Sequence, residues 1–532
     1  MNDFAVSQDD VLAFLADPAT HGGREVRRID THAGIVFLAG DRALKIKRAV
    51  RFPFLDYSTL AKRHAACVAE LEVNQPFAPE LYRRVLPIVR TADGRLALDG
   101  TGEPVEWAVE MLRFDENRTL DHLADDGRID DALADQLARA AAAMHARAPV
   151  VDFEAWLAAI DDILDQNVAA FNEFPDLFPV AAAERLDRAA RAVFDRLRPL
   201  LAERGRAGLV RRGHGDLHLG NIASIDGRPV PFDAIEFDPM IAAGDVLYDL
   251  AFLLMDLVER GLERPANLVL NRYLLETGRD VDLDGLAGLP FLLSLRAAIR
   301  AKVVAAQTRH ADAARRAKLA ESAKVYFNLA IRLLAPPPPV LVAIGGLSGT
   351  GKSALARALA PFVPPEPGAV IVRSDVERKS LCGVTETERL AAEAYGPQIN
   401  QQVYARVADK AARVVAAGHS AIADAVFARA GERAAIAAVA AKAGVPFHGI
   451  FLVADLVKRL ERIGARAVDA SDADAAVARQ QERYALGDMN WTRIDASGTL
   501  EETLTRVRSA IGRLAPGQAQ ATQGPSRSAG SP

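Results

Sequence analysis

Cysteine is nearly absent from this chain of 532 residues, which contains only Cys67 and Cys382. Two cysteines this far apart, neither of them in a Cys-x-x-Cys pair, argue against a disulfide framework and against a cysteine-ligated zinc site. The chain also lacks any apolar run of the ~20 residues that span a bilayer, and its first residues lack the basic and apolar segments of a secretory signal. We therefore expect a cytoplasmic protein without a membrane partner.

An excess of charge of one sign is missing as well. The chain carries 65 Lys and Arg residues and 70 Asp and Glu residues, so its formal net charge is −5. Such a chain has no overall basic field to attract nucleic acid, which argues against nucleic acid as a partner. The composition that remains, 50% hydrophobic and 25% charged, is ordinary for a globular protein, and the length suffices for at least two domains.

Apolar runs typical of β-strands mark residues 25–112, and a helical stretch at 59–74 interrupts them. The clearest strand-like runs are 34–38, 43–46, 85–89 and 107–111. Residues 119–334 are then mostly helical in pattern, except for strand-like residues at 221–233. Strands followed by helices predict an α+β domain with a small mixed lobe and a larger helical lobe, which we place at residues 1–335.

Four consecutive prolines at 336–339 break this pattern, because a proline run cannot continue a helix and forms a stiff spacer. After the prolines, strand-like and helical runs alternate, which predicts an α/β domain with a parallel sheet at residues 340–514. The strand-like runs lie at 340–344, 369–373, 420–423 and 447–453. Residues 515–532 are rich in Pro, Gly, Ser and Gln, and we expect them to form a disordered tail.

Residues 346–353, Gly-Leu-Ser-Gly-Thr-Gly-Lys-Ser, match the pattern GxxxxGK[ST] between an apolar strand and a helix. In this pattern the glycines let backbone N–H groups turn toward phosphate oxygens, the lysine reaches the β/γ-phosphates and the serine hydroxyl binds Mg²⁺. Only 11 of the 65 basic residues are lysine, so a chance match is rare and we discard the alternative of a plain glycine-rich turn. The ATP-binding residues predicted from this loop are Gly346, Ser348, Gly349, Thr350, Gly351, Lys352 and Ser353, with Ser353 also on the metal.

Asp375 and Arg378 follow the next predicted strand, 369–373, which we expect to lie beside the strand of the ATP-binding loop. At that edge of the sheet, Asp375 is placed to accept the proton of a substrate hydroxyl, and Arg378 to hold an anionic group. We weigh the alternative, a helix-capping aspartate with a solvated arginine, at about one to three. For Asp424, which follows the run 420–423, a role near the metal or acceptor and a plain capping role are weighed equally.

Two sets of arginines each share one face of a predicted helix. Arg459, Arg462 and Arg466 recur every three or four residues, and their face could close over the phosphates and stabilise transferring charge. We assign Arg462 and Arg466 to ATP binding, with a solvated basic face as a nearly equal alternative. Arg296 and Arg300 could line an anionic acceptor pocket, but we favour solvated side chains for this pair.

With these motifs, residues 340–512 resemble the P-loop small-molecule kinases related to gluconate kinase and zeta toxin. The resemblance is carried by GLSGTGKS, by the segment RSDVERK at 373–379 and by the downstream arginines. It implies an ATP-dependent kinase but does not specify the acceptor. The spacing of Asp375 and Arg378 is also similar to that of polynucleotide 5′-kinases.

A second motif, His-Gly-Asp-Leu-His-Leu-Gly-Asn, occupies residues 214–221. Phosphate transfer needs a carboxylate near the attacking oxygen and oxygen ligands for Mg²⁺, and Asp216 and Asn221 offer both from one short loop. A hairpin predicted to turn at Asp226-Gly227 would bring Asp233 back beside Asn221 as a second metal ligand. We weigh the alternative, a polar loop with a capping aspartate, at under about one in ten.

This motif resembles the catalytic loop of the aminoglycoside phosphotransferase and choline kinase family. The resemblance extends over residues 25–330 of this chain. The resemblance implies Asp216 as the catalytic base, with Asn221 and Asp233 binding Mg²⁺. It also implies that His214 shapes the loop and that Asp249 braces it.

The same family has a phosphate-binding lysine on a strand and a glutamate partner on the helix that follows. Lys45 is the best match for this lysine, but Lys47 points to the same face of the strand and remains an alternative. Glu70 is the expected partner, with Glu72 as the alternative. Two features depart from protein kinases: Asp233-Ala-Ile replaces Asp-Phe-Gly, and no clear GxGxxG loop covers the phosphates.

The combination resembles proteins described as fused aminoglycoside phosphotransferase and AAA-type ATP-binding proteins. We expect a bifunctional kinase that uses ATP and Mg²⁺ at two sites and phosphorylates hydroxyl groups of small molecules. Two other functions stay open. One is a nucleotide-operated regulatory ATPase whose kinase-like domain is a degenerate sensor, and the other is a polynucleotide 5′-kinase activity in the C-terminal domain.

Overall fold

The computed structural model describes residues 7–31, 33–52, 55–465 and 470–512 of the chain. The chain folds into two compact units, which are Met1–Gly278 with Phe291–Leu334, and Arg279–Pro290 with Ala335–Pro532. Within the described residues, no helix is both long enough and apolar enough to span a bilayer. Arg466 and the predicted tail at 515–532 lie outside the described residues.

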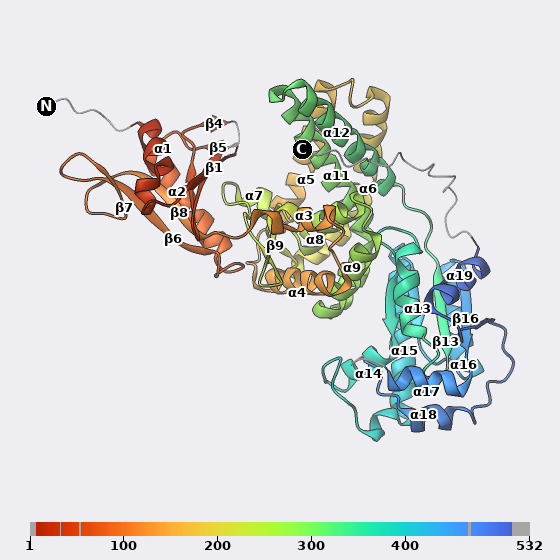
Figure 1. Cartoon of the computed structure of the whole chain (residues 1–532). Coiled ribbons are helices and arrows are strands. Elements are labelled where there is room, and N and C mark those ends of the chain that lie inside the picture. The colour runs from red at the N-terminus through yellow and green to blue at the C-terminus, as the bar shows by residue number, and fades with distance from the viewer. Residues whose placement is uncertain (1–6, 32, 53–54, 466–469, 513–532) are drawn as a thin grey trace. The chain divides into compact units, whose positions relative to one another are not determined.

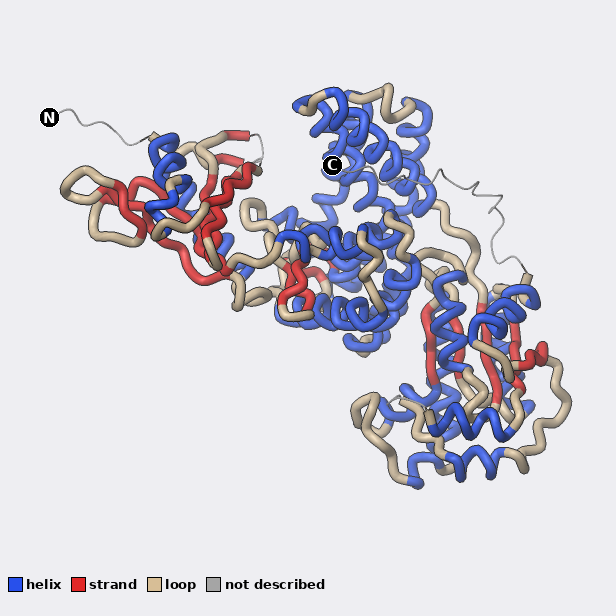
Figure 2. Tube along the Cα trace, viewed as in Figure 1, coloured by secondary structure: helices blue, strands red, loops and turns tan. Residues whose placement is uncertain are grey.

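The small lobe of the first unit is the strand-rich part near the N-terminus in Figures 1 and 2. It is an antiparallel sheet with the strand order β1-β2-β3-β8-β6-β7. Its strands are β1 (Val26–Asp30), β2 (Gly34–Ala39), β3 (Arg42–Lys47), β6 (Tyr82–Arg90), β7 (Leu96–Leu98) and β8 (Glu103–Leu112), and a separate pair is β4 (Arg51–Phe52) and β5 (Leu55–Asp56). Side chains alternate along β3, so Leu44 and Ile46 pack on the side of α1 (Gln8–Ala16). Lys45 and Lys47 therefore point to the opposite side, toward α2 (Leu60–Asn74).

The larger lobe of the first unit is mostly helical, as predicted (Figure 2). Its central helix, α8 (Val246–Glu259), is buried along nearly its whole length. Most of its side chains are apolar, and its buried carboxylates Asp249 and Asp256 accept hydrogen bonds from backbone N–H groups. The other helices are α3 (Leu120–Asp125), α4 (Asp131–Arg147), α5 (Phe153–Glu173), α6 (Val180–Arg206), α7 (Pro239–Ala242), α9 (Glu263–Thr277), α11 (Leu289–Gln307) and α12 (Ala313–Leu334).

Two short strand pairs accompany these helices. Strand β9 (Val210–Arg212) pairs with β12 (Ala243–Asp245), and β10 (Ile222–Ile225) pairs with β11 (Arg228–Pro231). The second pair is the predicted hairpin. It turns at Asp226 and Gly227, which both have positive φ, as expected for this type of tight turn.

The second unit is built on a parallel sheet with the strand order β14-β15-β13-β16-β17. Its strands are β13 (Leu341–Gly346), β14 (Val370–Arg373), β15 (Ala421–Asp424), β16 (Phe447–Val453) and β17 (Thr492–Asp495). The helices around the sheet are α13 (Lys352–Leu359), α14 (Ser374–Leu381), α15 (Pro397–Ala416), α16 (Ala430–Ala443), α17 (Leu456–Gly464), α18 (Ala475–Gln481) and α19 (Leu500–Ala510). The predicted α/β fold with a parallel sheet is confirmed, and β17 is a strand that the sequence pattern did not reveal.

One prediction about this sheet is wrong. We expected β14, which precedes Asp375, to lie beside the strand of the ATP-binding loop, but β15 separates β14 from β13. The order of strands in a parallel sheet depends on where each crossover returns, and α15 carries the chain back to the position between them. The strand that lies beside β13 on this side is therefore β15, which ends at Asp424, and not the strand that leads to Asp375.

A segment from the middle of the chain also belongs to the second unit. Residues 279–290 include α10 (Asp280–Gly285), which packs against α15. Arg413 Nη1 of α15 lies 2.9 Å from the Asp284 Oδ2 of α10. The second unit is therefore assembled from two separate stretches of sequence.

Candidate active sites

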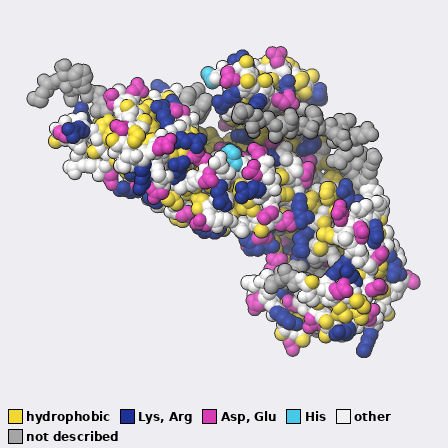
Figure 3. Space-filling model, in the orientation of Figure 1, with side chains coloured by type: hydrophobic (Ala, Val, Ile, Leu, Met, Phe, Trp, Pro, Cys, Tyr) yellow, Lys and Arg dark blue, Asp and Glu magenta, His cyan; other side chains and the backbone are white. Residues whose placement is uncertain are grey.

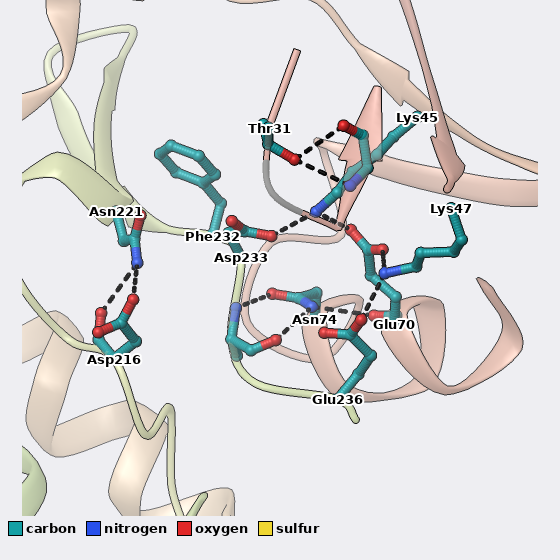
Figure 4. A network of polar contacts seen from close by, with 12 residues as sticks. Thr31, Lys45, Lys47, Glu70, Asn74, Asp216, Asn221, Phe232, Asp233 and Glu236 are labelled. Carbon is teal, nitrogen blue, oxygen red and sulfur yellow. Dashed lines mark hydrogen bonds and ion pairs between the residues drawn. The ribbon is translucent and has the colours of Figure 1, made fainter. Parts of the chain in front are cut away.

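The first candidate site lies on the loop before β10, where the Asp216 and Asn221 side chains face each other (Figure 4). The Asn221 amide nitrogen donates to Asp216 Oδ2 at 2.9 Å and to the Asp216 carbonyl at 3.0 Å. His218 Nε2 lies 3.4 Å from the same Oδ2. The Phe232 N–H donates to the Asn221 carbonyl at 2.9 Å, so the hairpin aligns residue 232 with residue 221 and Asp233 follows directly.

The Asp216 carboxyl group is held in its charged form. Burial alone would raise its pKa, but the hydrogen bond from His218 and the charges of His218 and Arg300 outweigh burial and keep the pKa below the usual range of an aspartate. A charged carboxylate at this position can accept a proton from a hydroxyl group that approaches it.

Asp249 of α8 supports this loop through its buried carboxylate, which is 4% exposed as a residue. It accepts hydrogen bonds from the backbone N–H groups of His214 at 2.8 Å and Gly215 at 2.9 Å. His145 Nε2 lies 3.1 Å from Asp249 Oδ2. A side chain at Gly213 would meet the same carboxylate, since a Cβ there would lie 2.6 Å from Oδ2. The conformation of the loop therefore depends on Asp249.

Replacing Asp249 with Ala is expected to lower the free energy of unfolding of the first unit by about 3–5 kcal/mol, because two backbone N–H groups and a buried imidazole lose their acceptor. Urea-induced unfolding of the full chain measures the change. The exposed Asp176 provides the matched control, and Asp176→Ala should leave the transition in place. An unchanged transition in Asp249→Ala would show that the loop does not depend on this carboxylate.

Arg296 of α11 is buried, so the favoured expectation of a solvated side chain is wrong for this residue. Its guanidinium donates to the Gly215 carbonyl at 3.0 Å and to the Tyr248 carbonyl at 3.2 Å, and it lies 3.6 Å from the centroid of the Tyr248 ring. Backbone carbonyls and an aromatic face satisfy this cation away from water. Arg300, one turn further along the helix, is only partly buried.

The lysines of β3 both contact Glu70 of α2 (Figure 4). Lys45 Nζ lies 2.8 Å from Glu70 Oε1 and 2.5 Å from Asp233 Oδ1, and Lys47 Nζ lies 2.5 Å from Glu70 Oε2. Burial alone would raise the pKa of Glu70, but the charges of the two lysines outweigh burial and lower it. Glu72, the alternative partner, is exposed on the other side of the helix turn. Glu70 is therefore the glutamate that meets the lysines.

The second candidate site is the loop between β13 and α13. Gly346, Gly349 and Gly351 have φ values of 142°, 86° and 94°, which only glycine adopts easily. At Gly349 a Cβ would lie 2.6 Å from the Arg459 carbonyl. The loop leads into the N-terminus of α13, whose first residue, Lys352, is partly exposed. Turned backbone N–H groups at a helix N-terminus form a site suited to phosphate.

Asp424, whose role the sequence left open, contacts the serine of this loop. Ser353 Oγ donates to Asp424 Oδ2 at 2.5 Å, and Arg373 Nε lies 3.5 Å from the same oxygen. Asp375 stands at the start of α14. Burial and the neighbouring Asp424 carboxylate raise the pKa of Asp375, while the charges of Lys352 and Arg373 oppose the rise. Asp424 therefore accepts a hydrogen bond from Ser353 and also acts on Asp375 through its charge.

Two side chains that support this loop were not correctly anticipated. Gln481 Oε1 accepts from the Ser348 N–H at 2.6 Å, and Gln481 Nε2 donates to Ser348 Oγ at 2.9 Å. Arg459, which is 1% exposed, donates to the Ser348 carbonyl at 2.8 Å, so it is not solvated and holds the loop backbone. Arg462 Nη1 reaches the Thr350 carbonyl at 3.3 Å. No sequence signal pointed to Gln481, because it lies about 130 residues after the loop at the end of a short helix.

A further cluster surrounds Arg378, which is buried. Its Nη1 donates to the Ala394 carbonyl at 2.8 Å, and its guanidinium lies 4.7 Å from the centroid of the Tyr395 ring. Asp472 accepts from the Tyr395 hydroxyl at 2.8 Å and from Lys379 Nζ at 3.0 Å. Among the described residues, Arg378 Nε is buried without a hydrogen-bond partner. Lysine is rare in this chain, so Lys379 beside Arg378 is a sequence signal that could have indicated this cluster.

Two family models match separate parts of the chain, and each matched part contains one of the two candidate sites. Residues 37–292 match the family model described as the phosphotransferase enzyme family, and residues 341–486 match the family model described as an AAA domain. The two ranges do not overlap. The first contains Asp216, Asn221 and Asp233, and the second contains the loop with Lys352.

Three individual proteins illustrate the similarity. A protein of Mycobacterium tuberculosis described as uncharacterized is 29% identical over 497 residues, which are 91% of this chain and 95% of that protein. A gluconokinase structure from Sinorhizobium meliloti has 17% identity and a TM-score of 0.25, covering 33% of this chain and 93% of that one. A choline kinase structure from Cryptosporidium parvum has 10% identity and a TM-score of 0.38, covering 62% of this chain and 95% of that one.

Proposed function

We propose that this chain, which joins a domain of the phosphotransferase enzyme family to a P-loop kinase domain, is a bifunctional enzyme that transfers phosphate from ATP to hydroxyl groups of small molecules. Each domain would bind its own ATP together with Mg²⁺. The observation that carries the proposal is the arrangement of the first unit. There Asp216 and Asn221 are in hydrogen-bond contact, and the adjoining hairpin presents Asp233 to Lys45.

The first unit offers oxygen atoms that suit Mg²⁺, a cation that prefers oxygen ligands. Asn221 contacts Asp216 through its amide nitrogen, so its amide oxygen points elsewhere. The Asp233 carboxylate is 44% exposed and open to a cation. Asn221 and Asp233 would hold the metal, which would neutralise phosphate charge. Lys45 would bind the phosphates.

Asp216 would act as the general base of the first site. As the hydroxyl oxygen of the acceptor bonds to the γ-phosphorus, its proton passes to the Asp216 carboxylate and ADP leaves with the electrons of the broken P–O bond. The charged state of Asp216 prepares it for this step. The Asn221 amide orients the carboxylate, which keeps the accepting oxygen in one position.

In the second unit, Lys352 and the N–H groups of its loop would bind the phosphates. Ser353 would hold Mg²⁺, with Asp424 fixing the serine hydroxyl. Asp375 would take the proton of the acceptor hydroxyl, and Arg378 would bind an anionic group of the acceptor. Arg462 would contribute charge beside the loop.

Small molecules are favoured over polyanionic acceptors because acidic and basic side chains are interspersed on the face drawn in Figure 3. The proposal is tested by a screen of small alcohols and sugars for ADP release from ATP, run without any added protein. Oligonucleotides with 5′-hydroxyl ends are included in the panel. The wild type is compared with Asp216→Asn and with Lys352→Ala. Each substitution should lower the turnover of its own unit only, whereas equal profiles in all three proteins would exclude two independent kinase sites.

The two activities are expected to differ in their response to acid. A general base works only when its carboxylate is deprotonated. The pKa of Asp216 is lowered, so turnover by the first unit should persist down to the usual aspartate pKa of about 3.9 or below. The pKa of Asp375 is raised by burial and by Asp424, so turnover by the second unit should fall at a higher pH.

Initial rates of Lys352→Ala and Asp216→Asn, each with the acceptor of its remaining active unit, measure this difference from about pH 4 to 8. Circular dichroism at each pH confirms that the proteins stay folded. If the rates of the two variants fall at the same acidic pH, the assignment of Asp216 and Asp375 as the two bases is contradicted.

A further inference from the structure

Two lysines and three carboxylates form one continuous network beside the first candidate site (Figure 4). Lys45 contacts Glu70 and Asp233, while Lys47 contacts the other oxygen of Glu70 and also the Glu236 carboxylate. Glu70 belongs to α2 of the small lobe, whereas Asp233 and Glu236 belong to the segment that follows β11. The network therefore connects the small lobe to this segment twice, and Glu70 is shared by both connections.

The two connections differ in how easily a ligand can reach them. The side chains of Lys45 and Asp233 are 14% and 44% exposed. Those of Lys47 and Glu236 are only 3% and 8% exposed, and Glu70 is fully buried. ATP and a metal ion can approach the first pair from solvent, but the second pair is enclosed by protein.

Other contacts hold the segment after β11 independently of Lys45. The Ala234 N–H donates to Asn74 Oδ1 at 2.8 Å, and the Tyr57 hydroxyl donates to Glu236 Oε1 at 2.9 Å. Asn74 belongs to α2, the same helix as Glu70, and Tyr57 precedes that helix. The segment can therefore stay in place when Lys45 releases Asp233.

We propose that Lys47 and Glu236 form a positioning pair that keeps Glu70 and the segment after β11 in place while Lys45 exchanges Asp233 for the phosphates of ATP. This inference rests on the proposed function of the first unit. In it, Lys45 is the phosphate-binding lysine, and Lys47 contacts neither ATP nor acceptor.

Charge balance explains why this site contains two lysines. When Lys45 turns its positive charge toward ATP, the buried Glu70 and Glu236 carboxylates still need a counter-charge, and Lys47 supplies it. A buried carboxylate without a partner is strongly destabilising, so Glu70 would otherwise hold Lys45 back or leave its position. Lys47 thus allows Lys45 to bind the nucleotide while Glu70 and Glu236 keep their positions.

The test compares Lys47→Met, Glu236→Gln, the double variant and Lys45→Met, all in the full chain carrying Lys352→Ala, which weakens ATP-Mg binding by the second unit and keeps that unit's contribution the same in every variant. Titration calorimetry measures the affinity for ATP-Mg and for adenosine. Lys62→Met is the matched control, because Lys62 is exposed on the same α2 helix. Glu236→Gln is isosteric and keeps the test valid should Lys47→Met fail to fold.

We expect Lys47→Met and Glu236→Gln each to weaken ATP-Mg binding about tenfold, the scale on which a partner that orients a ligand-binding side chain acts. The double variant should be no weaker than either single variant, and adenosine binding should not change. Hydrogen exchange at residues 233–238 should increase in both single variants when ATP-Mg is bound.

If Lys47 bound phosphate instead, Glu236→Gln would change the affinity for ATP-Mg in the opposite direction. Removing the Glu236 charge would then free the lysine, so Glu236→Gln would bind ATP-Mg equally or more tightly, and that result would overturn the inference. Loss of adenosine binding in step with ATP-Mg would also overturn it, because the pair would then be purely structural. If Lys45→Met binds ATP-Mg as tightly as its parent, the proposed function of the first unit fails instead.

Discussion

Replacing Asp216 with Asn should reduce phosphate transfer by the first unit by about 10²–10⁴-fold, the usual contribution of a general base. Asparagine has nearly the same shape and can still contact Asn221, so the loop should keep its conformation. It cannot accept the proton of the acceptor hydroxyl. The loss should therefore appear in kcat, with little change in the affinity for ATP-Mg. Steady-state ADP release with the acceptor found by the screen measures both quantities.

The same substitution at Asp226 is the matched control for this experiment. Asp226 is exposed at the tip of the neighbouring hairpin with a φ of 51°, a conformation that asparagine adopts readily. Asp226→Asn should retain wild-type turnover. A wild-type kcat in Asp216→Asn would mean that another group accepts the proton, and the role given to Asp216 would be wrong.

Replacing Lys352 with Ala should weaken ATP binding by the second unit by about 10- to 100-fold, because hydrogen bonds to charged groups contribute about 1.5–3 kcal/mol each. The loop itself should remain folded, since its glycines, Ser348 and Arg459 hold it through backbone contacts. Adenosine should bind as before. Titration with ATP-Mg in an Asp216→Asn background, with Lys45→Met added to weaken ATP-Mg binding by the first unit, measures this site.

Lys442 provides the control, because it is an exposed lysine of α16 in the same unit. Lys442→Ala should bind ATP-Mg as tightly as its parent. Should Lys352→Ala also bind with unchanged affinity, the loop would not be a phosphate site, despite its glycine geometry.

Local patterns predicted the parts of both sites that lie close together in sequence. The loop from His214 to Asn221 and the loop from Gly346 to Ser353 are each eight residues long, so their residue types alone constrain the geometry. The alternation of β3 likewise predicted that Lys45 and Lys47 point to one face, and the structure confirms it. The roles given to these residues remain predictions.

Contacts between distant parts of the sequence could not be predicted in this way. Asp472 and Gln481 reach their partners from elements about 80–130 residues away, and no local period reveals such a meeting. The position of β15 between β14 and β13 depends on the packing of α15 rather than on the strand sequences. Arg296 has the pattern of a surface cation, but carbonyl groups and an aromatic ring from other elements give it a buried site.

The placement of α10 has a consequence for how the protein can be divided. Because residues 279–290 belong to the second unit, the chain passes between the units three times: after Gly278, after Pro290 and after Leu334. A fragment that starts after the proline run would lack Asp284 and leave the side of α15 around Arg413 uncovered. The residues after Leu334 therefore do not make up the whole second unit, which also includes a short segment that lies more than forty residues earlier in the sequence.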